Sequence, residues 1–156
     1  MDRASAVMGH TPFASADFGK VPPSLTADRP ERLLHADVLG GAAPEDGKFS
    51  QARRHLVRMV DLPSRALSMT LGGLAPGEST RRHRHNYETI IYVVAGAGVS
   101  VIEDREVRWR AGDAFYVPTW AWHQHSNTSA AESALYVACE NAPMLQNLGI
   151  ALREEA

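Results

Sequence analysis

Hydrophobic and polar residues alternate in short runs from Arg65 onwards, and turn residues separate these runs at regular intervals. Short alternating runs predict β-strands, and a regular series of them predicts an all-β sandwich or barrel. No long helical period interrupts the series. We expect strands at Ala66–Leu71, Glu88–Val94, Val99–Ile102, Val107–Arg110, Ala114–Val117, Trp120–His125 and Glu132–Cys139.

The first part of the chain carries a weaker pattern. Its first thirty residues are rich in Ala, Ser, Pro and Gly, which predicts an arm that is partly disordered. The pattern over Glu31–Leu39 fits a helical turn or a strand, and it does not decide between them. Turn residues follow at Gly40-Gly41 and Pro44–Gly47, and Gln51–Val60 alternates well enough to predict a strand.

These patterns divide the chain into two parts. Residues 1–62 form an N-terminal arm, partly irregular, that packs on the barrel or on a partner subunit. Residues 63–156 form the β-barrel domain, which adds one helical turn at Ala142–Leu148 and ends in a charged tail at Arg153–Ala156.

Histidines gather within the predicted strands. His83 and His85 are two residues apart, as are His123 and His125. Side chains two apart in a strand point to the same face, so each pair can direct two imidazoles at one ion. Imidazole is the commonest metal ligand among side chains. The other three, His10, His35 and His55, have no partner at this spacing and are interpreted as solvated or packed residues.

Composition limits the classes of partner. A chain of 156 residues with 44% hydrophobic residues is long enough to bury one core, and its net charge of −2 argues against a general nucleic-acid binder. Cys139 is the only cysteine, which fits a reducing compartment. No stretch reaches the roughly 18 apolar residues of a spanning helix, and no apolar signal segment is present. We expect a cytoplasmic protein with no nucleic-acid or membrane partner.

Apolar faces also point outward from the predicted barrel. Past Tyr87 both faces of the strand that ends at Val94 are apolar, so this strand should be covered on both sides. Trp120 and Trp122 point away from the face that carries His123, and they need a cover from the N-terminal arm or a second subunit. Exposed apolar area of this extent favours a homodimer.

The histidine stretches resemble the two motifs of the cupin superfamily. The first motif is matched at Gly77, His83, His85 and Gly96, and the second at Gly112, Pro118, His123 and Asn127. Trp120 stands where the second motif has a glycine. The resemblance covers about half of the chain, Arg65–Asn141, and implies a double-stranded β-helix, the cupin jelly-roll barrel. A fold of this kind hosts many reactions.

One departure from the motif changes the expected ligand set. Glu88 falls one residue short of the usual glutamate position, where Thr89 stands instead. Because a shift of one residue turns a side chain to the other face unless a bulge intervenes, we expect Glu88 not to bind metal. The resemblance then implies a metal site of His83, His85 and His123. This set and the phrase VPTWAWHQHSN look like the gentisate 1,2-dioxygenase branch, whose members cleave aromatic rings at ferrous iron.

The resemblance implies a metal-dependent dioxygenase, with Fe(II) as the metal, although Mn, Ni, Cu and Zn also accept imidazole. A site of three neutral histidines would take a small chelating organic acid, a hydroxylated aromatic acid or a dicarbonyl. Arg81, on the ligand face, is the candidate partner for a substrate carboxylate, and His125 is the candidate acid or base. Two alternatives stay open: a non-catalytic or accessory cupin that binds a small ligand, and a non-redox metal-dependent isomerase, decarboxylase or lyase.

Overall fold

The structure is a computed structural model that describes residue 19 and residues 24–41 and 44–156. The chain divides into two units, Met1–Pro30 and Glu31–Ala156. All of the described helices and strands belong to the second unit. His10 and most of the breaker-rich start of the predicted arm lie outside the described residues.

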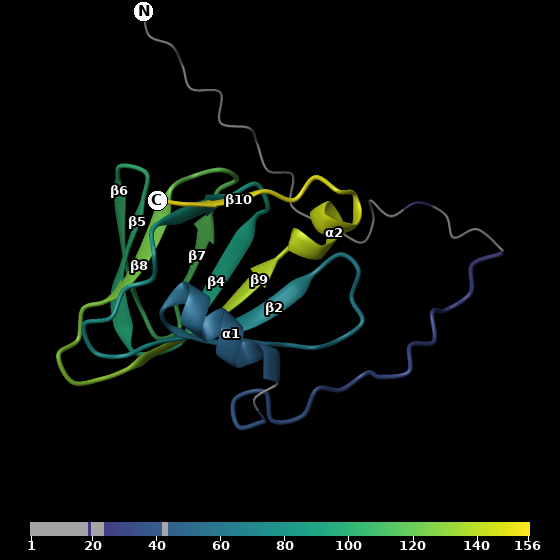
Figure 1. The fold of residues 1–156 in the computed structure, drawn as a ribbon, viewed down its shortest axis with the longest axis horizontal. Coiled ribbons are helices and arrows are strands. Elements are labelled where there is room, and N and C mark those ends of the chain that lie inside the picture. Colours follow the sequence, from purple (N-terminus) through teal and green to yellow (C-terminus); the bar gives the residue numbers. More distant parts are fainter. Residues whose placement is uncertain (1–18, 20–23, 42–43) are drawn as a thin grey trace, which may run out of the picture. The chain divides into compact units, whose positions relative to one another are not determined.

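Two antiparallel sheets of five strands each make up the second unit (Figure 1). The first sheet has the order β1 (Leu56–Met59), β2 (Ser68–Leu74), β9 (Ala134–Glu140), β4 (Thr89–Ala95) and β7 (Ala114–Val117). The second has the order β10 (Arg153–Glu155), β3 (His83–His85), β8 (His123–Asn127), β5 (Ala97–Ile102) and β6 (Arg105–Arg110). Strands distant in sequence are neighbours in both sheets, as in a jelly roll. The predicted all-β jelly-roll fold is confirmed, as two facing sheets rather than one closed ladder.

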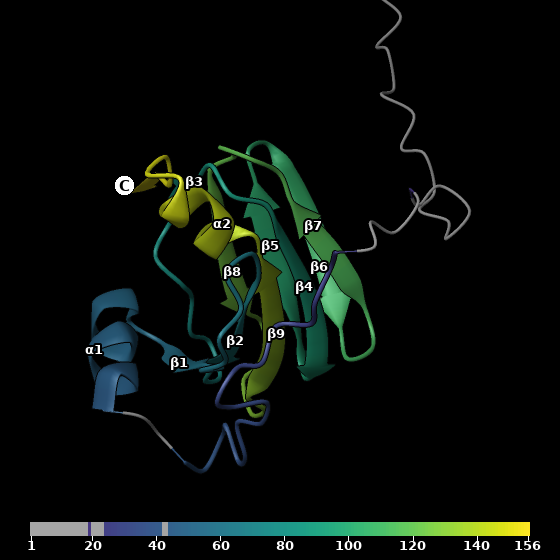
Figure 2. The same ribbon diagram turned by 90° about the vertical axis from the view of Figure 1, so that its right-hand side faces the viewer.

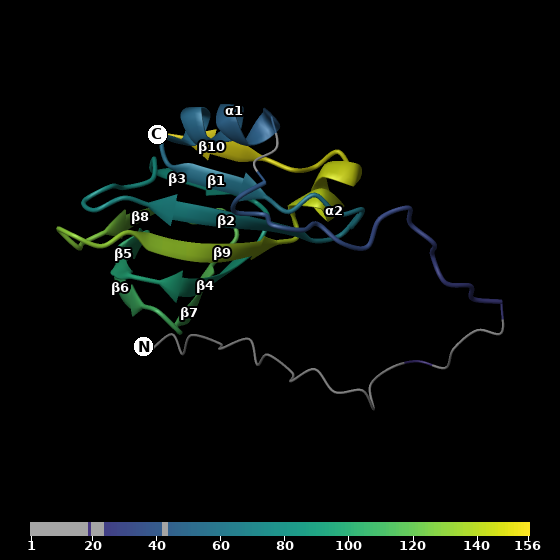
Figure 3. The ribbon, with the colours of Figure 1, turned by 90° about the horizontal axis from the view of Figure 1, so that it is seen from below.

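The core lies between the two sheets, which face each other in Figures 2 and 3. In β4, Thr89, Ile91 and Val93 are buried because they point to the second sheet. The alternate residues Ile90, Tyr92 and Val94 are 57%, 50% and 45% exposed. Among the described residues the outer face of this strand is open, so its predicted cover stays a prediction that a second subunit would have to fulfil.

The helices and the C-terminal strand correct three sequence predictions. Residues Pro44–Arg53 form α1, with acidic residues in its first turn and Arg53 in its last, a charge order that stabilises the helix dipole. The predicted turn at Pro44–Gly47 and the start of the predicted strand are therefore helical, and only Leu56–Met59 pairs with β2. The division of the chain at residue 62 stays a prediction, but the predicted arm supplies an edge strand of the first sheet.

The predicted helical turn near the C-terminus is present as α2, Ala142–Asn147. The predicted charged tail is a strand instead, because β10 pairs with β3 and sets Arg153 opposite His85 and Glu155 opposite His83. Neither α1 nor α2, the helices of the described residues, has the length and apolar content needed to span a bilayer.

The outer face of the second sheet carries the two tryptophans. The Arg84 guanidinium lies 4.5 Å from the Trp120 ring centroid and 4.6 Å from that of Trp122, and the Arg82 guanidinium lies 5.1 Å from the Trp122 ring. These cation–π contacts cover the rings with side chains of the neighbouring segment. The cover that we expected from the arm or a second subunit is thus supplied in part by the chain's own arginines.

Candidate metal centre

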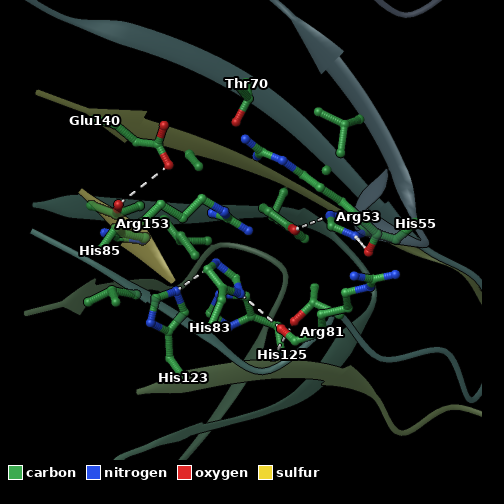
Figure 4. A pocket seen from close by; sticks show the side chains of 18 residues that line it. Arg53, His55, Thr70, Arg81, His83, His85, His123, His125, Glu140 and Arg153 are labelled. Carbon is green, nitrogen blue, oxygen red and sulfur yellow. Dashed lines mark hydrogen bonds between the residues drawn. The ribbon is translucent and has the colours of Figure 1, made fainter. Parts of the chain in front are cut away.

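Three histidines converge between the sheets at one end of the core. His83 and His85 lie on β3, and His123 lies directly opposite His83 on β8. One ring nitrogen from each of the three lies within 4.8 Å of the others. Figure 4 shows the three rings directed at one another at the wall of a pocket. The structure thus brings together the three residues that the motif resemblance implied as ligands.

Backbone carbonyls fix the tautomer of each ring. The Nδ1 atoms of His83, His85 and His123 lie 2.8 Å from the carbonyl oxygens of Arg81, Tyr87 and Ala121 respectively. A carbonyl oxygen only accepts, so each Nδ1 carries the proton and donates. Each Nε2 of a neutral ring is then left with a free lone pair. This arrangement orients a histidine for metal binding through Nε2.

Electrostatics keep the rings neutral. Burial, followed by the neighbouring imidazole of His123, lowers the pKa of His83 to about 2 and the pKa of His85 to about 4. Burial also lowers the pKa of His123. The Nε2 atoms of His83 and His123 are only 3.0 Å apart. When both Nδ1 atoms hold the protons, two lone pairs face each other there, and a cation relieves their repulsion. The donor set therefore fits a divalent metal ion.

A strained turn places His123. Trp120 has a φ of 63°, in the left-handed region that a non-glycine residue rarely adopts. This is the position where the cupin motif has a glycine, the residue that adopts such a φ without strain. The Trp120 N–H donates to the His85 carbonyl at 2.7 Å, and this bond connects the turn before β8 to β3.

A buried hydrogen-bond chain holds His125 beside the three candidate metal ligands. The Trp109 indole N–H donates to Ser100 Oγ at 2.9 Å, and Ser100 Oγ lies 2.7 Å from His125 Nδ1. Ser100 is fully buried, so its hydroxyl proton needs an acceptor. The Nδ1 atom of His125 is that acceptor, and the Ser100 hydroxyl therefore donates to it. His125 then keeps its proton on Nε2. Burial, followed by the neighbouring His123, lowers the pKa of His125 to about 3, so the ring is neutral at pH 7.

The structure places Arg81 and Glu88 differently. Arg81 lines the pocket, but its guanidinium is bonded to Glu155 at 2.8 Å. Glu88 does not line the pocket, and it accepts a hydrogen bond from the Tyr116 hydroxyl at 2.8 Å. Thr89, one residue on, lines the pocket instead.

Several pocket residues were missed at the sequence level. Arg53, His55, Tyr136, Glu140 and Arg153 all line the pocket beside the three histidines (Figure 4). His55, interpreted as a packed or solvated residue, lies 3.2 Å through its Nε2 from the Tyr136 hydroxyl. Arg153 was placed in a charged tail. None of these five residues lies at a spacing that marks a known motif. Only Tyr136 and Glu140 could have been found from the sequence, because the alternation of β9 puts them on one face.

The pocket is rich in positive charge. Three guanidinium groups, those of Arg53, Arg81 and Arg153, line it, against a single carboxylate, that of Glu140, among the described residues. Arg53 forms no ion pair with any of the described residues, and it contacts the ring of Phe49 through a cation–π interaction. Such a pocket favours an anionic molecule with an oxygen that reaches the histidine cluster.

Comparison with known proteins agrees with this geometry. Residues 70–139 match the model of the cupin domain. The chain is 40% identical over 125 residues to 5-aminosalicylate 1,2-dioxygenase from Comamonas sp, a match of 79% of this chain and 32% of that protein. It is 39% identical over 57 residues to gentisate 1,2 dioxygenase 1 from Aquipseudomonas alcaligenes, covering 36% of this chain and 16% of that protein. The chain thus spans about a third or less of the length of these relatives.

A solved structure has a similar fold. Salicylate 1,2-dioxygenase from Pseudaminobacter salicylatoxidans superposes with a TM-score of 0.62 at 23% identity, over 68% of this chain and 32% of that chain. This likeness concerns the fold alone. The relatives named as aminosalicylate and gentisate dioxygenases are what confirm the resemblance to the gentisate-type branch that the motifs implied.

Proposed function

We propose that this chain, whose residues 70–139 form a cupin domain, acts as a metal-dependent dioxygenase on a small hydroxylated aromatic acid of the salicylate type. One observation carries the proposal: three histidines present free Nε2 lone pairs to one point, beside a pocket lined by three arginines. The relatives named as aminosalicylate and gentisate dioxygenases support the same substrate class.

We further propose Fe(II) as the metal, held by His83, His85 and His123. Imidazole alone does not select iron over Mn, Ni, Cu or Zn, and the names of the relatives as dioxygenases are what support iron. Iron held by these three histidines would supply the redox chemistry that O₂ activation needs. No carboxylate belongs to the cluster of the described residues, so an anionic substrate would supply the charge that the three neutral ligands lack.

The protein's own residues would bind and orient the substrate. The Arg53 guanidinium, free of ion pairs among the described residues, binds the substrate carboxylate, with Arg81 in a smaller role because Glu155 already occupies it. His125 donates a hydrogen bond from Nε2–H to a substrate oxygen. Because its low pKa leaves the ring neutral at pH 7, we narrow the acid or base of the sequence hypothesis to a neutral hydrogen-bond donor.

Oxygen uptake tests the proposal. Protein loaded anaerobically with iron should consume O₂ with at least one member of a panel of salicylate, gentisate, 5-aminosalicylate and 5-nitrosalicylate, and the ring absorbance should change with it. The zinc-loaded protein is the matched control, because zinc has no redox chemistry. Tight binding without oxygen uptake by the iron form would contradict the dioxygenase and favour the accessory or non-redox cupin.

We also propose that the protein is a homodimer that pairs through the outer face of the first sheet. Ile90, Tyr92, Val94 and Tyr116 form an exposed apolar patch on β4 and β7. Light scattering should give the mass of two chains at micromolar concentration, and Ile90→Lys should shift it toward one chain without lowering the melting temperature. A monomeric wild type would refute the dimer. The cytoplasmic location and the lack of nucleic-acid and membrane partners stay predictions from the sequence.

A further inference from the structure

One carboxylate stands in a pocket that otherwise suits an anion. Glu140 ends β9, opposite Thr89 of β4 and Ser68 of β2. It is the only carboxylate among the described residues that line the pocket. Figure 4 shows it on the same side of the pocket as His85 and Arg153, while Arg53 and Arg81 enter from the other side.

The hydrogen bonds of Glu140 are few and long. The Ser68 and Thr89 hydroxyls approach its carboxylate oxygens at 3.5 Å each, the outer limit for such a bond. An ionised carboxylate offers about four acceptor positions. Within the described part of the chain Glu140 makes no ion pair, although Arg53 and Arg153 line the same pocket. Some acceptor positions of the Glu140 carboxylate that face the pocket thus receive no hydrogen bond from the described residues.

The Glu140 carboxylate is unfavourable in a pocket that binds an anion. A partly buried carboxylate repels the substrate carboxylate and loses hydration, so a compensating interaction is expected. Burial raises the pKa of Glu140, while the charges of Arg53 and Arg153 act in the opposite direction. A hydrogen-bond donor on the bound molecule would fill the acceptor positions of Glu140 that the described residues leave open.

We propose that Glu140 is a specificity-determining residue that accepts a hydrogen bond from an amino or hydroxyl group on the substrate ring. Arg53 binds the carboxylate of the substrate, the histidine cluster lies beside its adjacent oxygen, and Glu140 binds a donor substituent elsewhere on the ring. A nitro group, which only accepts, meets the Glu140 oxygens unfavourably. This inference rests on the proposed function and narrows its substrate class to aromatic acids with a donor substituent.

A purely structural role makes a different prediction. If Glu140 served only to hold the side chains of Arg53 and Arg153, its loss would weaken every aromatic carboxylate alike, because all of them share the carboxylate. A role in specificity changes the ratios between substrates instead. The same four compounds used for oxygen uptake therefore distinguish the two roles.

The test is a comparison of wild type, Glu140→Gln and Glu140→Leu, with Glu88→Gln as the matched control on an exposed glutamate outside the pocket. In the iron-loaded protein, kcat/KM for the aminated and hydroxylated members should fall about ten- to a hundredfold in Glu140→Leu, and less in Glu140→Gln, whose amide oxygen still accepts a hydrogen bond. The value for salicylate, which lacks the substituent, should change less than about threefold. Glu140→Gln, whose amide donates, should raise the value for the nitro compound, and Glu88→Gln should match wild type.

Binding to the zinc-loaded protein, measured by calorimetry, separates this inference from the proposed function. Suppose that the preference for donor substituents disappears in Glu140→Leu, in a protein whose iron form takes up no oxygen. That result would support the role of Glu140 and would reject the dioxygenase. Equal weakening of all four compounds in a protein that does take up oxygen would overturn the role of Glu140 and leave the dioxygenase standing. Melting temperatures identify any variant that fails to fold. If one Glu140 variant fails, the other one tests whether Glu140 determines substrate preference.

Discussion

Replacement of His123 by alanine is expected to remove nearly all bound divalent metal and all oxygen uptake. His123 is 2% exposed and lies opposite His83, with their Nε2 atoms 3.0 Å apart, so its loss leaves two ligands on one strand. Removal of a group that merely orients a ligand lowers metal affinity by about 10–100-fold, and removal of the ligand itself should cost more. Metal content after dialysis, measured by mass spectrometry, gives the result directly.

Two variants serve as controls for this experiment. Glu88→Gln should keep its metal, because the Glu88 side chain bonds to Tyr116 outside the pocket. His125→Ala should also keep its metal and lose substrate affinity instead. Equal metal loss in Glu88→Gln and His123→Ala would mean that the carboxylate reaches the ion and that the ligand set is the ordinary one of three histidines and one glutamate. Undiminished metal in His123→Ala would place the ion elsewhere.

Replacement of Arg53 by alanine is expected to weaken binding of an aromatic carboxylate by about 10–150-fold, or about 1.5–3 kcal/mol. The Arg53 guanidinium lines the pocket, and among the described residues no acidic group neutralises it within ion-pair distance. A substrate carboxylate would form a bidentate, charge-assisted pair with it. Calorimetric titration of the zinc-loaded protein with salicylate measures the change without turnover.

Arg81→Ala is the matched comparison, because it removes a second guanidinium from the same pocket. Its effect should be smaller, since the ion pair with Glu155 at 2.8 Å already occupies that side chain. A larger loss for Arg81→Ala than for Arg53→Ala would restore the sequence hypothesis that Arg81 binds the carboxylate. Arg53→Lys should bind the aromatic carboxylate more tightly than Arg53→Ala and less tightly than wild type. The lysine ammonium keeps the positive charge but cannot form the bidentate pair.

The sequence by itself determined the all-β jelly-roll fold and the three converging histidines. Residues two apart in a strand share a face whatever the strand packs against, so the spacing of His83 and His85 suffices to pair them. The resemblance to a two-motif family then supplied His123 from a strand 38 residues further on. The resemblance placed Trp120 at the glycine position of the second motif, but its φ of 63° came only from the structure.

Only the tertiary structure decided which charges surround that cluster. Arg53 comes from the end of a helix, Glu140 from the end of β9 and Arg153 from the short edge strand β10. Their proximity depends on the order of strands in two sheets, which places residues 85 and 153 opposite each other although nothing in their sequence separation indicates it. Local periodicity specifies which face a side chain takes. Long-range pairing specifies its neighbours, and the pocket's binding chemistry arises from those neighbours.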